Sequence, residues 1–193
     1  MQASELGKRL LNYTISHSGA ETRGYLGMSA IGQCPRKLYL DMVQGREWTT
    51  QSHLFCYLGY LFEQSVLERL RAMKPDLLGP SREFSDFGGR FMGHSDGSWD
   101  GDLLEIKSIT ASRFPGGRIS NGHYWQVQTY MRYGGYKRAN VIYVARDTGE
   151  IRVIEVRFNS RIAELARLKA GSILEAVDRR EPPECECGWC GRA

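Results

Sequence analysis

Three ionisable side chains, Asp96, Glu105 and Lys107, lie close together in the stretch GHSDGSWDGDLLEIKS. Within it, Asp100-Gly101 predicts a two-residue type I′ turn, because both central residues of that turn need positive φ. A hairpin closed by this turn places Asp96 opposite Glu105, and side-chain alternation puts Lys107 on the same face. The stretch therefore predicts a hairpin with one charged face.

Three further residues are placed on the two faces of this hairpin. The same register pairs His94 with Lys107, so we expect His94 to lie near the acids as a neighbour rather than a ligand. Leu104 and Ile106 point to the opposite face and predict a helix packed there.

Carboxylates that face each other repel, and partial burial makes that repulsion costly unless a cation lies between them. Mg²⁺ is held by one or two carboxylates and completes its shell with water and phosphate oxygens. Lys107 could stabilise charge on a phosphate, or help position and deprotonate an attacking water. The alternative is a surface hairpin with solvated charges. The shared face, the Asp-Gly turn and the apolar opposite face favour a metal site.

The chain ends in a second group with metal chemistry, Cys185-x-Cys187-x-x-Cys190. Thiols so crowded, with little chain left to bury them, are typical of a metal site rather than of free cysteines. A fourth ligand is needed. Cys56 is one candidate, although a cysteine in an apolar helix is most simply a small buried residue.

Composition narrows the class of protein. The 193 residues fit one domain, 41% are hydrophobic and 25% are charged, and the net charge of +4 allows an anionic partner without requiring one. No apolar run approaches a membrane span or a secretory signal, so we expect a cytoplasmic protein without a membrane partner. In a reducing compartment cysteines favour metal binding over disulfides.

The elements that position these residues follow from apolar spacing and turn residues. We expect a loosely held segment over 1–25, a short helix with CPRKLYL that Ser29 could cap, and a core helix over 52–73. Strands are predicted near 82–87, 90–99, 102–109, 139–145 and 151–158, and further helices near 122–133 and 160–179. This order predicts an α/β fold, a mixed sheet flanked by helices.

Two helices carry further candidate site residues. Glu63 shares an apolar helix face with Val66 and Leu70, so its carboxylate needs a partner, unless it extends to solvent from the edge of that face. Gln126 and Tyr130 lie one turn apart on the next helix, which suits a pair that binds substrate or orients Lys107; Tyr130 could also be simply a packed core residue.

Together these motifs resemble the PD-(D/E)xK nuclease superfamily, in particular its RecB-like branch. GHSDG with LLEIKS resembles the core motif, QVQTY the Q-x-x-x-Y motif, and GYLFE falls where the branch has G-x-x-x-H, with Glu63 in place of histidine. CPRKLYL and ECECGWC resemble the terminal cysteine motifs of the CRISPR-associated RecB-like exonucleases, although the spacing of ECECGWC is narrower than usual. The resemblance covers most of the chain.

The resemblance implies a restriction-endonuclease-like core in a single RecB-like nuclease domain, residues 1–193. It implies that Asp96, Glu105, the carbonyl of Ile106 and Glu63 hold Mg²⁺ or Mn²⁺, with Lys107, Gln126 and Tyr130 as further catalytic residues. It also supplies Cys34 as the fourth ligand of a [4Fe-4S] cluster with Cys185, Cys187 and Cys190, or of Zn²⁺, joining the N-terminal segment to the C-terminal tail.

We therefore expect a metal-dependent deoxyribonuclease, an exonuclease acting on single-stranded DNA or DNA ends. In it a metal-bound water, assisted by Lys107, attacks the phosphodiester. Protein partners in recombination or CRISPR adaptation are compatible with the resemblance. Two alternatives stay open: a nuclease-fold module that binds DNA or assembles without cutting, and a redox-sensing cysteine–metal protein.

Overall fold

The computed structural model describes residues 4–20, 23–114, 116–185 and 187. Its α-helices are α1 (Glu5–Ser16), α2 (Pro35–Val43), α3 (Thr50–Met73), α4 (Asn121–Gly134) and α5 (Ser160–Arg179). Its strands are β1 (Leu26–Gly27), β2 (Leu78–Gly79), β3 (Glu83–Asp86), β4 (Phe91–His94), β5 (Gly97–Trp99), β6 (Asp102–Ile109), β7 (Arg138–Ala145) and β8 (Ile151–Arg157).

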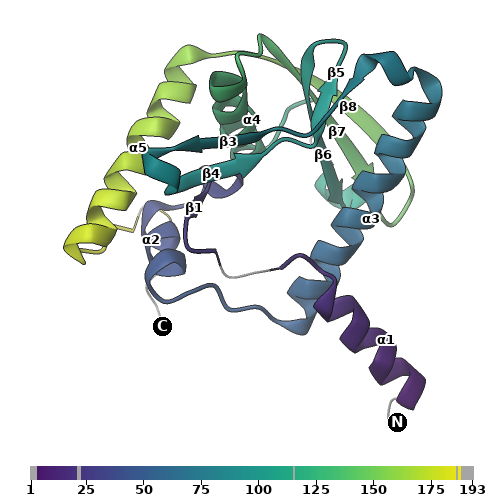
Figure 1. Cartoon of the computed structure of the whole chain (residues 1–193), viewed down its shortest axis with the longest axis horizontal. Helices are drawn as coiled ribbons and strands as arrows, with labels where there is room; N and C mark the ends of the chain where they lie inside the picture. Colours follow the sequence, from purple (N-terminus) through teal and green to yellow (C-terminus); the bar gives the residue numbers. More distant parts are fainter. Residues whose placement is uncertain (1–3, 21–22, 115, 186, 188–193) are drawn as a thin grey trace.

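The strands form two sheets, which Figure 1 shows with the helices around them. One sheet has the order β2-β5-β6-β7-β8 and the other the order β1-β4-β3. In the larger sheet only the β6–β7 pair is parallel. A parallel pair needs a long crossover, and α4 provides it between these two strands. α4 is thereby brought next to the strand that carries Glu105.

Helices cover both faces of the larger sheet. Leu104 and Ile106 of β6 pack with Ile142 and Val144 of β7 against Val66 of α3, as the alternation predicts. The opposite face belongs to the main core, where Leu103, Val141 and Tyr143 are buried with residues of α4 and α5. β6 therefore lies between α3 on one face of the sheet and α4 on the other. Side chains from both helices can approach the residues of β6.

The N-terminal segment differs from expectation. Residues 5–16 form helix α1, capped by Ser4, whose Oγ accepts a hydrogen bond from the Gly7 amide at 3.2 Å. α1 has no buried residue among those described, so its helical state depends on local preference and the cap rather than on core burial. The sequence analysis did not predict this helix, but the exposure of α1 agrees with the expected loose attachment of the segment.

α3 has the predicted extent but not the predicted burial. Within it only Val66 is buried, and Leu58, Leu61 and Met73 are exposed, Leu61 by 44%. The N-terminal half of α3 extends beyond the larger sheet and lies near α1 (Figure 1). The spacing correctly predicted an apolar face, but the sheet covers only the second half of it.

The strand expected over 90–99 is two strands in different sheets. β4 ends at His94 and β5 begins at Gly97, so the chain passes from the smaller to the larger sheet at Ser95 and Asp96. Ser95 is buried, and its backbone N–H donates to the Arg82 carbonyl at 3.0 Å while its Oγ accepts from the Arg82 amide at 3.2 Å. These bonds fix the crossing point.

Ser29 does not cap the helix that follows it. It lies in a short 3₁₀ helix, Met28–Ala30, and α2 begins six residues later at Pro35 with Cys34 in the N-cap position. Proline is favoured at the first helical position, where its missing N–H costs nothing. Pro35 rather than a serine therefore marks the start of α2, and the Cys34 side chain makes no cap hydrogen bond there.

The mixed sheet with helices on both faces confirms the predicted α/β class. Among the helices that the structure describes, none is both long and apolar enough to span a membrane.

Candidate active site

The β5–β6 hairpin has the predicted turn and register. Asp100 and Gly101 both have positive φ, 51° and 79°. Gly97 pairs with Leu104, and Trp99 with Asp102. The prediction from Asp100-Gly101 is confirmed, and it fixes which side chains of β6 point toward α4.

Asp96 lies just before β5, where β6 continues without a partner on that edge. Its Oδ2 accepts a hydrogen bond from the Ile106 amide at 2.6 Å and so replaces a strand neighbour there. Burial, opposed by the charge of Lys107 and by this hydrogen bond, raises the pKa of Asp96 above its usual range. The Asp96 carboxylate is thereby fixed beside the backbone of Ile106.

His94 is not part of this group. It ends β4 and pairs with Glu83 of β3, with its Nε2 3.0 Å from Glu83 Oε2 on the surface. The predicted pairing of His94 with Lys107 was wrong because β4 leaves the hairpin before that position. Gly93, the residue before it, lies against Tyr130: a Cβ on Gly93 would come within 2.7 Å of the tyrosine ring.

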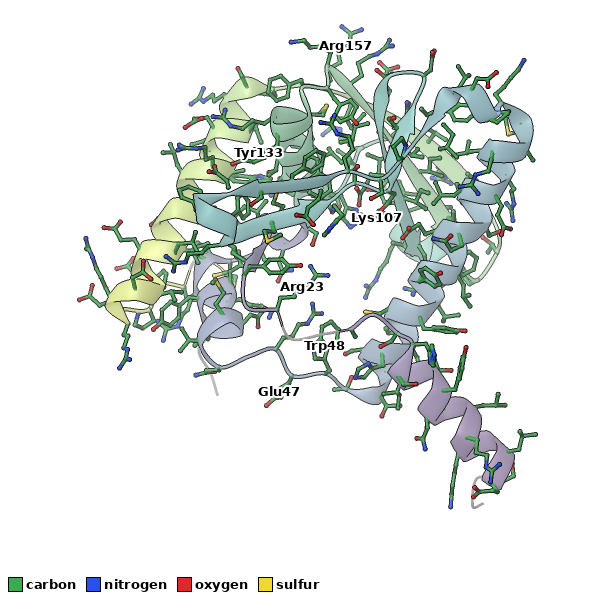
Figure 2. The ribbon with its side chains drawn as sticks, viewed as in Figure 1. Arg23, Glu47, Trp48, Lys107, Tyr133 and Arg157 are labelled. Carbon is green, nitrogen blue, oxygen red and sulfur yellow. The ribbon has the colours of Figure 1, made fainter. Side chains whose placement is uncertain are left out.

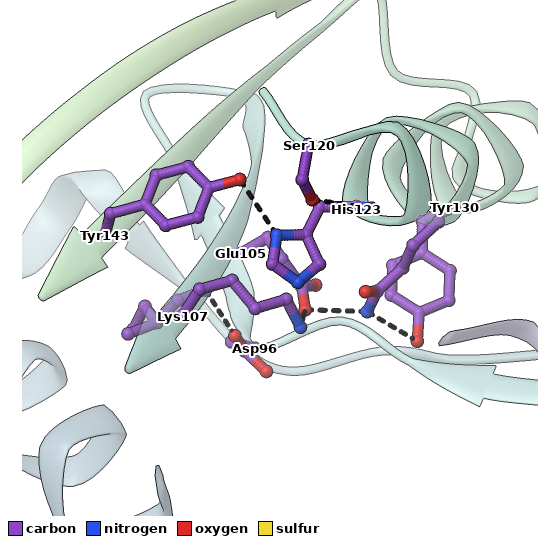
Figure 3. Close-up of polar contacts among 9 residues, drawn as sticks. Asp96, Glu105, Lys107, Ser120, His123, Tyr130 and Tyr143 are labelled. Carbon is purple, nitrogen blue, oxygen red and sulfur yellow. Dashed lines mark hydrogen bonds and ion pairs between the residues drawn. The ribbon is translucent and has the colours of Figure 1, made fainter. Parts of the chain in front are cut away.

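Glu105 is the most buried acid of the site, with 2% of its surface exposed. Its Oε1 accepts hydrogen bonds from Lys107 Nζ at 2.5 Å and from Gln126 Nε2 at 2.7 Å (Figure 3). Its Oε2 is buried and has no hydrogen-bond partner within the described ranges. Burial and the charge of Asp96 raise the pKa of Glu105 to about 8, against the lowering effect of Lys107. A buried carboxylate oxygen without a partner fits a cation ligand.

Lys107 follows on the same face of β6, with its ammonium against Glu105. Burial favours the neutral amine, but the charges of Glu105 and Asp96 and the hydrogen bond to Glu105 outweigh it, so the pKa of Lys107 lies above its usual value. Lys107 is therefore a cation at neutral pH. This favours electrostatic stabilisation over proton abstraction as its chemistry.

Glu63 approaches the same site from α3. Burial, together with the negative charge of Asp96, raises the pKa of Glu63 to about 7, although Lys107 opposes the shift. Glu63 and Asp96 also line one cavity between α3 and the segment before β3. The structure thus brings together the three predicted acids, two from the hairpin and one from α3.

The acids are not gathered as tightly as the cysteines. Among the described residues, the only three His, Cys, Asp or Glu side chains with ligand atoms all within 4.8 Å of one another are Cys34, Cys185 and Cys187. This looser arrangement suits Mg²⁺ or Mn²⁺, which take part of their shell from water and substrate oxygens.

Gln126 and Tyr130 reach the site from α4 but contact Glu105 rather than Lys107. Gln126 Nε2 donates to Glu105 Oε1 and lies 3.3 Å from the Tyr130 hydroxyl (Figure 3). Both residues are buried, and the ring of Tyr130 packs 5.4 Å from that of Phe84. Their geometry supports a role in orienting Glu105, because neither side chain is exposed to an incoming strand.

His123 and Tyr143 also lie at this site, although neither was predicted from the sequence. His123 Nδ1 lies 2.9 Å from the Tyr143 hydroxyl, and burial and the charge of Lys107 lower the pKa of His123 to about 4. Tyr143 is the partner of Lys107 in the parallel β6–β7 pair. His123 precedes Gln126 by three residues on the same helix, so helical spacing could have indicated it. No sequence pattern indicates Tyr143, because the register of a parallel pair is not set by a turn.

Arg23 is a further missed residue. It lies on the segment before β1, in the central part of the molecule below Lys107 (Figure 2). Its positive charge acts on the Tyr130 hydroxyl and opposes the rise of the Tyr130 pKa, which burial and Glu105 cause. Arg23 therefore adds positive charge on the side of the site that faces β1.

The cysteines form a second candidate site, where the start of α2 meets the C-terminal segment. Cys34 at the start of α2 meets Cys185 and Cys187, and the Sγ atoms of Cys185 and Cys187 are 3.6 Å apart. Arg36 Nη1 donates to the Pro183 carbonyl at 3.3 Å and holds the tail against α2. The predicted ligand Cys190 lies outside the described residues. Cys56 is on α3 and lines a different cavity, so it does not belong to this group.

No family model matches the chain, and no curated protein matches it in sequence. Solved structures do match its fold. The crystal structure of a protein named SSO0001 has a TM-score of 0.63 and 16% identity, covering 97% of this chain and 94% of that one. The alkaline exonuclease LHK-Exo of Laribacter hongkongensis, in complex with dAMP, has a TM-score of 0.64 and 13% identity over 82% and 90%.

A third solved structure is similar over most of its length. A phage-related exonuclease from Haemophilus somnus has a TM-score of 0.56 and 11% identity, covering 79% of this chain and 81% of that one. At such identities the likeness establishes the fold. The chain therefore has the mixed α/β fold of these exonuclease structures, which confirms the predicted restriction-endonuclease-like core.

Proposed function

We propose that this chain is a divalent-metal-dependent deoxyribonuclease, an exonuclease acting on single-stranded DNA or DNA ends. The observation that carries the proposal is the buried Glu105, one oxygen of which has no partner in the described part of the chain, beside Asp96, Glu63 and a protonated Lys107. The fold shared with an alkaline exonuclease and a phage-related exonuclease supports it.

Mg²⁺ or Mn²⁺ would be held by Asp96, Glu105, the Ile106 carbonyl and Glu63, and when bound it would supply Lewis-acid activation of water and phosphate. The protein's own groups then have separate tasks. Lys107 places a positive charge where negative charge develops on the phosphate. Gln126, supported by Tyr130, holds Glu105 Oε1 and so leaves Oε2 free to bind the cation.

End-labelled single- and double-stranded DNA tests this function. We expect wild-type protein to cut with Mn²⁺ or Mg²⁺ and not with EDTA, and Asp96→Ala to cut with neither. A terminal label released as mononucleotide would show exonuclease action. If the folded protein binds DNA but cuts none of these substrates with either metal, the non-cutting DNA-binding module is the correct alternative.

We further propose that Cys34, Cys185, Cys187 and Cys190 hold a [4Fe-4S] cluster, or Zn²⁺, that joins α2 to the C-terminal tail and makes residues 1–193 one nuclease domain. Three thiols already within 4.8 Å of one another support this. Cysteine thiolates are ligands for both an iron-sulfur cluster and Zn²⁺. A metal site that joins Cys34 to the C-terminal cysteines closes a loop that contains most of the chain.

Replacing Cys34 is expected to lower both metal content and stability. Closing a loop of about 150 residues contributes about 5 kcal/mol by the chain-entropy estimate for a cross-link, so Cys34→Ser should unfold at a clearly lower temperature. Iron, sulfide and zinc content and the melting temperature are the measurements. The matched control is Cys56→Ser, which should keep its metal. If Cys34→Ser kept the wild-type metal content, Cys34 would not be a ligand.

A further inference from the structure

A cavity of about 470 Å³ opens beside the acids, between α3 and the segment from Pro75 to Ser81. Glu63 and Asp96 form part of its wall. Anything that fills this cavity therefore touches two of the carboxylates that would hold the metal. Its size suits a sugar and a base rather than a single ion or water.

The cavity wall formed by α3 changes from acidic to apolar to basic along the helix. Glu63, Leu67 and Arg71 line the cavity and follow one another at intervals of four residues, so they form one row on the helix. The Cα atoms of Glu63 and Arg71 are about 12 Å apart along the helix. The row thus runs from an acid, past an apolar residue, to a guanidinium.

The remaining lining residues fit a nucleotide between these two ends. Leu78 and Pro80 add apolar surface, and Gln64 and Ser81 add hydrogen-bonding groups. Arg71 is exposed in the last turn of α3 and makes no salt bridge within the described ranges. An unpaired guanidinium at the far end of an apolar wall is suited to a phosphate.

We propose that this cavity is the subsite for the nucleotide next to the scissile phosphate, and that Arg71 binds the outer phosphate of that nucleotide. The inference rests on the proposed function, because it assumes that the scissile phosphate lies at the acids. The outer phosphate is either a terminal monoester or the next phosphodiester of the strand, and Arg71 would recognise either by the same contact.

The test compares Arg71→Ala with the matched control Arg69→Ala. Arg69 lies two residues earlier on α3, donates to Ser65 and does not line the cavity. Oligothymidylates with and without terminal phosphates are the substrates. We expect Arg71→Ala to raise KM roughly 10-fold with kcat within about 2-fold, and to reduce the salt dependence of binding by about one phosphate contact. Arg71→Lys should recover part of the loss.

Equilibrium binding of the same oligonucleotides in EDTA separates this inference from the proposed function. If wild-type protein binds these oligonucleotides in EDTA but does not cut them when Mn²⁺ or Mg²⁺ is present, the nuclease proposal fails. Weaker binding by Arg71→Ala than by Arg69→Ala would still support the subsite. An effect limited to phosphorylated ends identifies the terminal monoester, and an equal effect on both substrates identifies the internal phosphodiester. Equal binding and KM for Arg71→Ala and Arg69→Ala, or a fall in kcat alone, would overturn the subsite.

Discussion

Lys107→Met is expected to reduce the rate of DNA cutting by roughly 10²–10³-fold or more, with DNA binding nearly unchanged. The ammonium of Lys107 is held against Glu105, and its raised pKa keeps it charged at neutral pH. Methionine has similar length but no charge, so it removes stabilisation of the phosphate and leaves the packing. Single-turnover cutting with Mn²⁺, and binding in EDTA, measure the two effects separately.

The matched control is Lys74→Met, which removes an exposed lysine at the end of α3. It should cut at the wild-type rate. If Lys107→Met also cut at the wild-type rate, the charge of Lys107 would have no part in the chemistry. If instead it lost DNA binding to the same extent as cutting, Lys107 would be a binding residue only.

Glu105→Gln is expected to abolish cutting and also to change how stability depends on pH. The carboxyl of Glu105 has a pKa of about 8 in the folded chain and 4.5 as its ordinary value. Between these values the folded chain keeps a proton that the unfolded chain has lost. The resulting stability is complete below pH 4.5 and is lost as the pH rises through 8.

Glu63 also lowers the stability of the folded chain as the pH rises, because its pKa is raised from an ordinary value of 4.5 to about 7. Without metal, the melting temperature of wild-type protein should therefore fall as the pH rises from 5 toward 8. The fall should be shallower in Glu105→Gln, since glutamine has no proton to lose. Scanning calorimetry in EDTA measures this. Added Mg²⁺ should stabilise wild-type protein more at high pH, where it no longer competes with the proton.

Glu68→Gln is the matched control, because Glu68 is an exposed glutamate on α3. It should keep both activity and the wild-type pH dependence. Equal slopes for wild type and Glu105→Gln would show that Glu105 is already ionised in the folded chain, contrary to its burial beside Asp96.

The local part of the site could be predicted from the sequence. Asp100-Gly101 fixes the hairpin turn, and the turn fixes which residues of β6 share a face, so Glu105 and Lys107 were placed correctly. Gln126 and Tyr130 share a helix face for an equally local reason. Such predictions succeed because turn chemistry and side-chain periodicity act over a few residues.

The parts that failed depend on distant contacts. His94 was misplaced because β4 pairs with β3 rather than continuing the hairpin. The pattern of residues 90–99 does not predict that the chain passes from one sheet to the other there. The exposure of Leu61 follows from where the sheet ends, not from the spacing along α3. Tyr143 meets Lys107 only through a parallel pair joined by α4.

The cysteine site could be predicted only in part from the spacing of its residues. Cys185 and Cys187 are crowded in the sequence, but only the resemblance to a known family indicated Cys34, about 150 residues earlier. The structure places all three thiols together. Spacing alone left Cys56 as a rival, because the sequence does not show that Cys56 lines a different cavity from the one where α2 meets the tail.

Binding of Mn²⁺, followed by electron paramagnetic resonance, tests most directly the claim that the acids hold the catalytic cation. Wild-type protein and Glu105→Gln are compared with the cysteine site equally filled, so that differences report the acidic site alone. We predict saturable Mn²⁺ binding to wild-type protein and binding at least about 10-fold weaker in Glu105→Gln. Equal affinity in the two proteins would contradict the account, because the buried oxygen of Glu105 would then have no part in holding the metal.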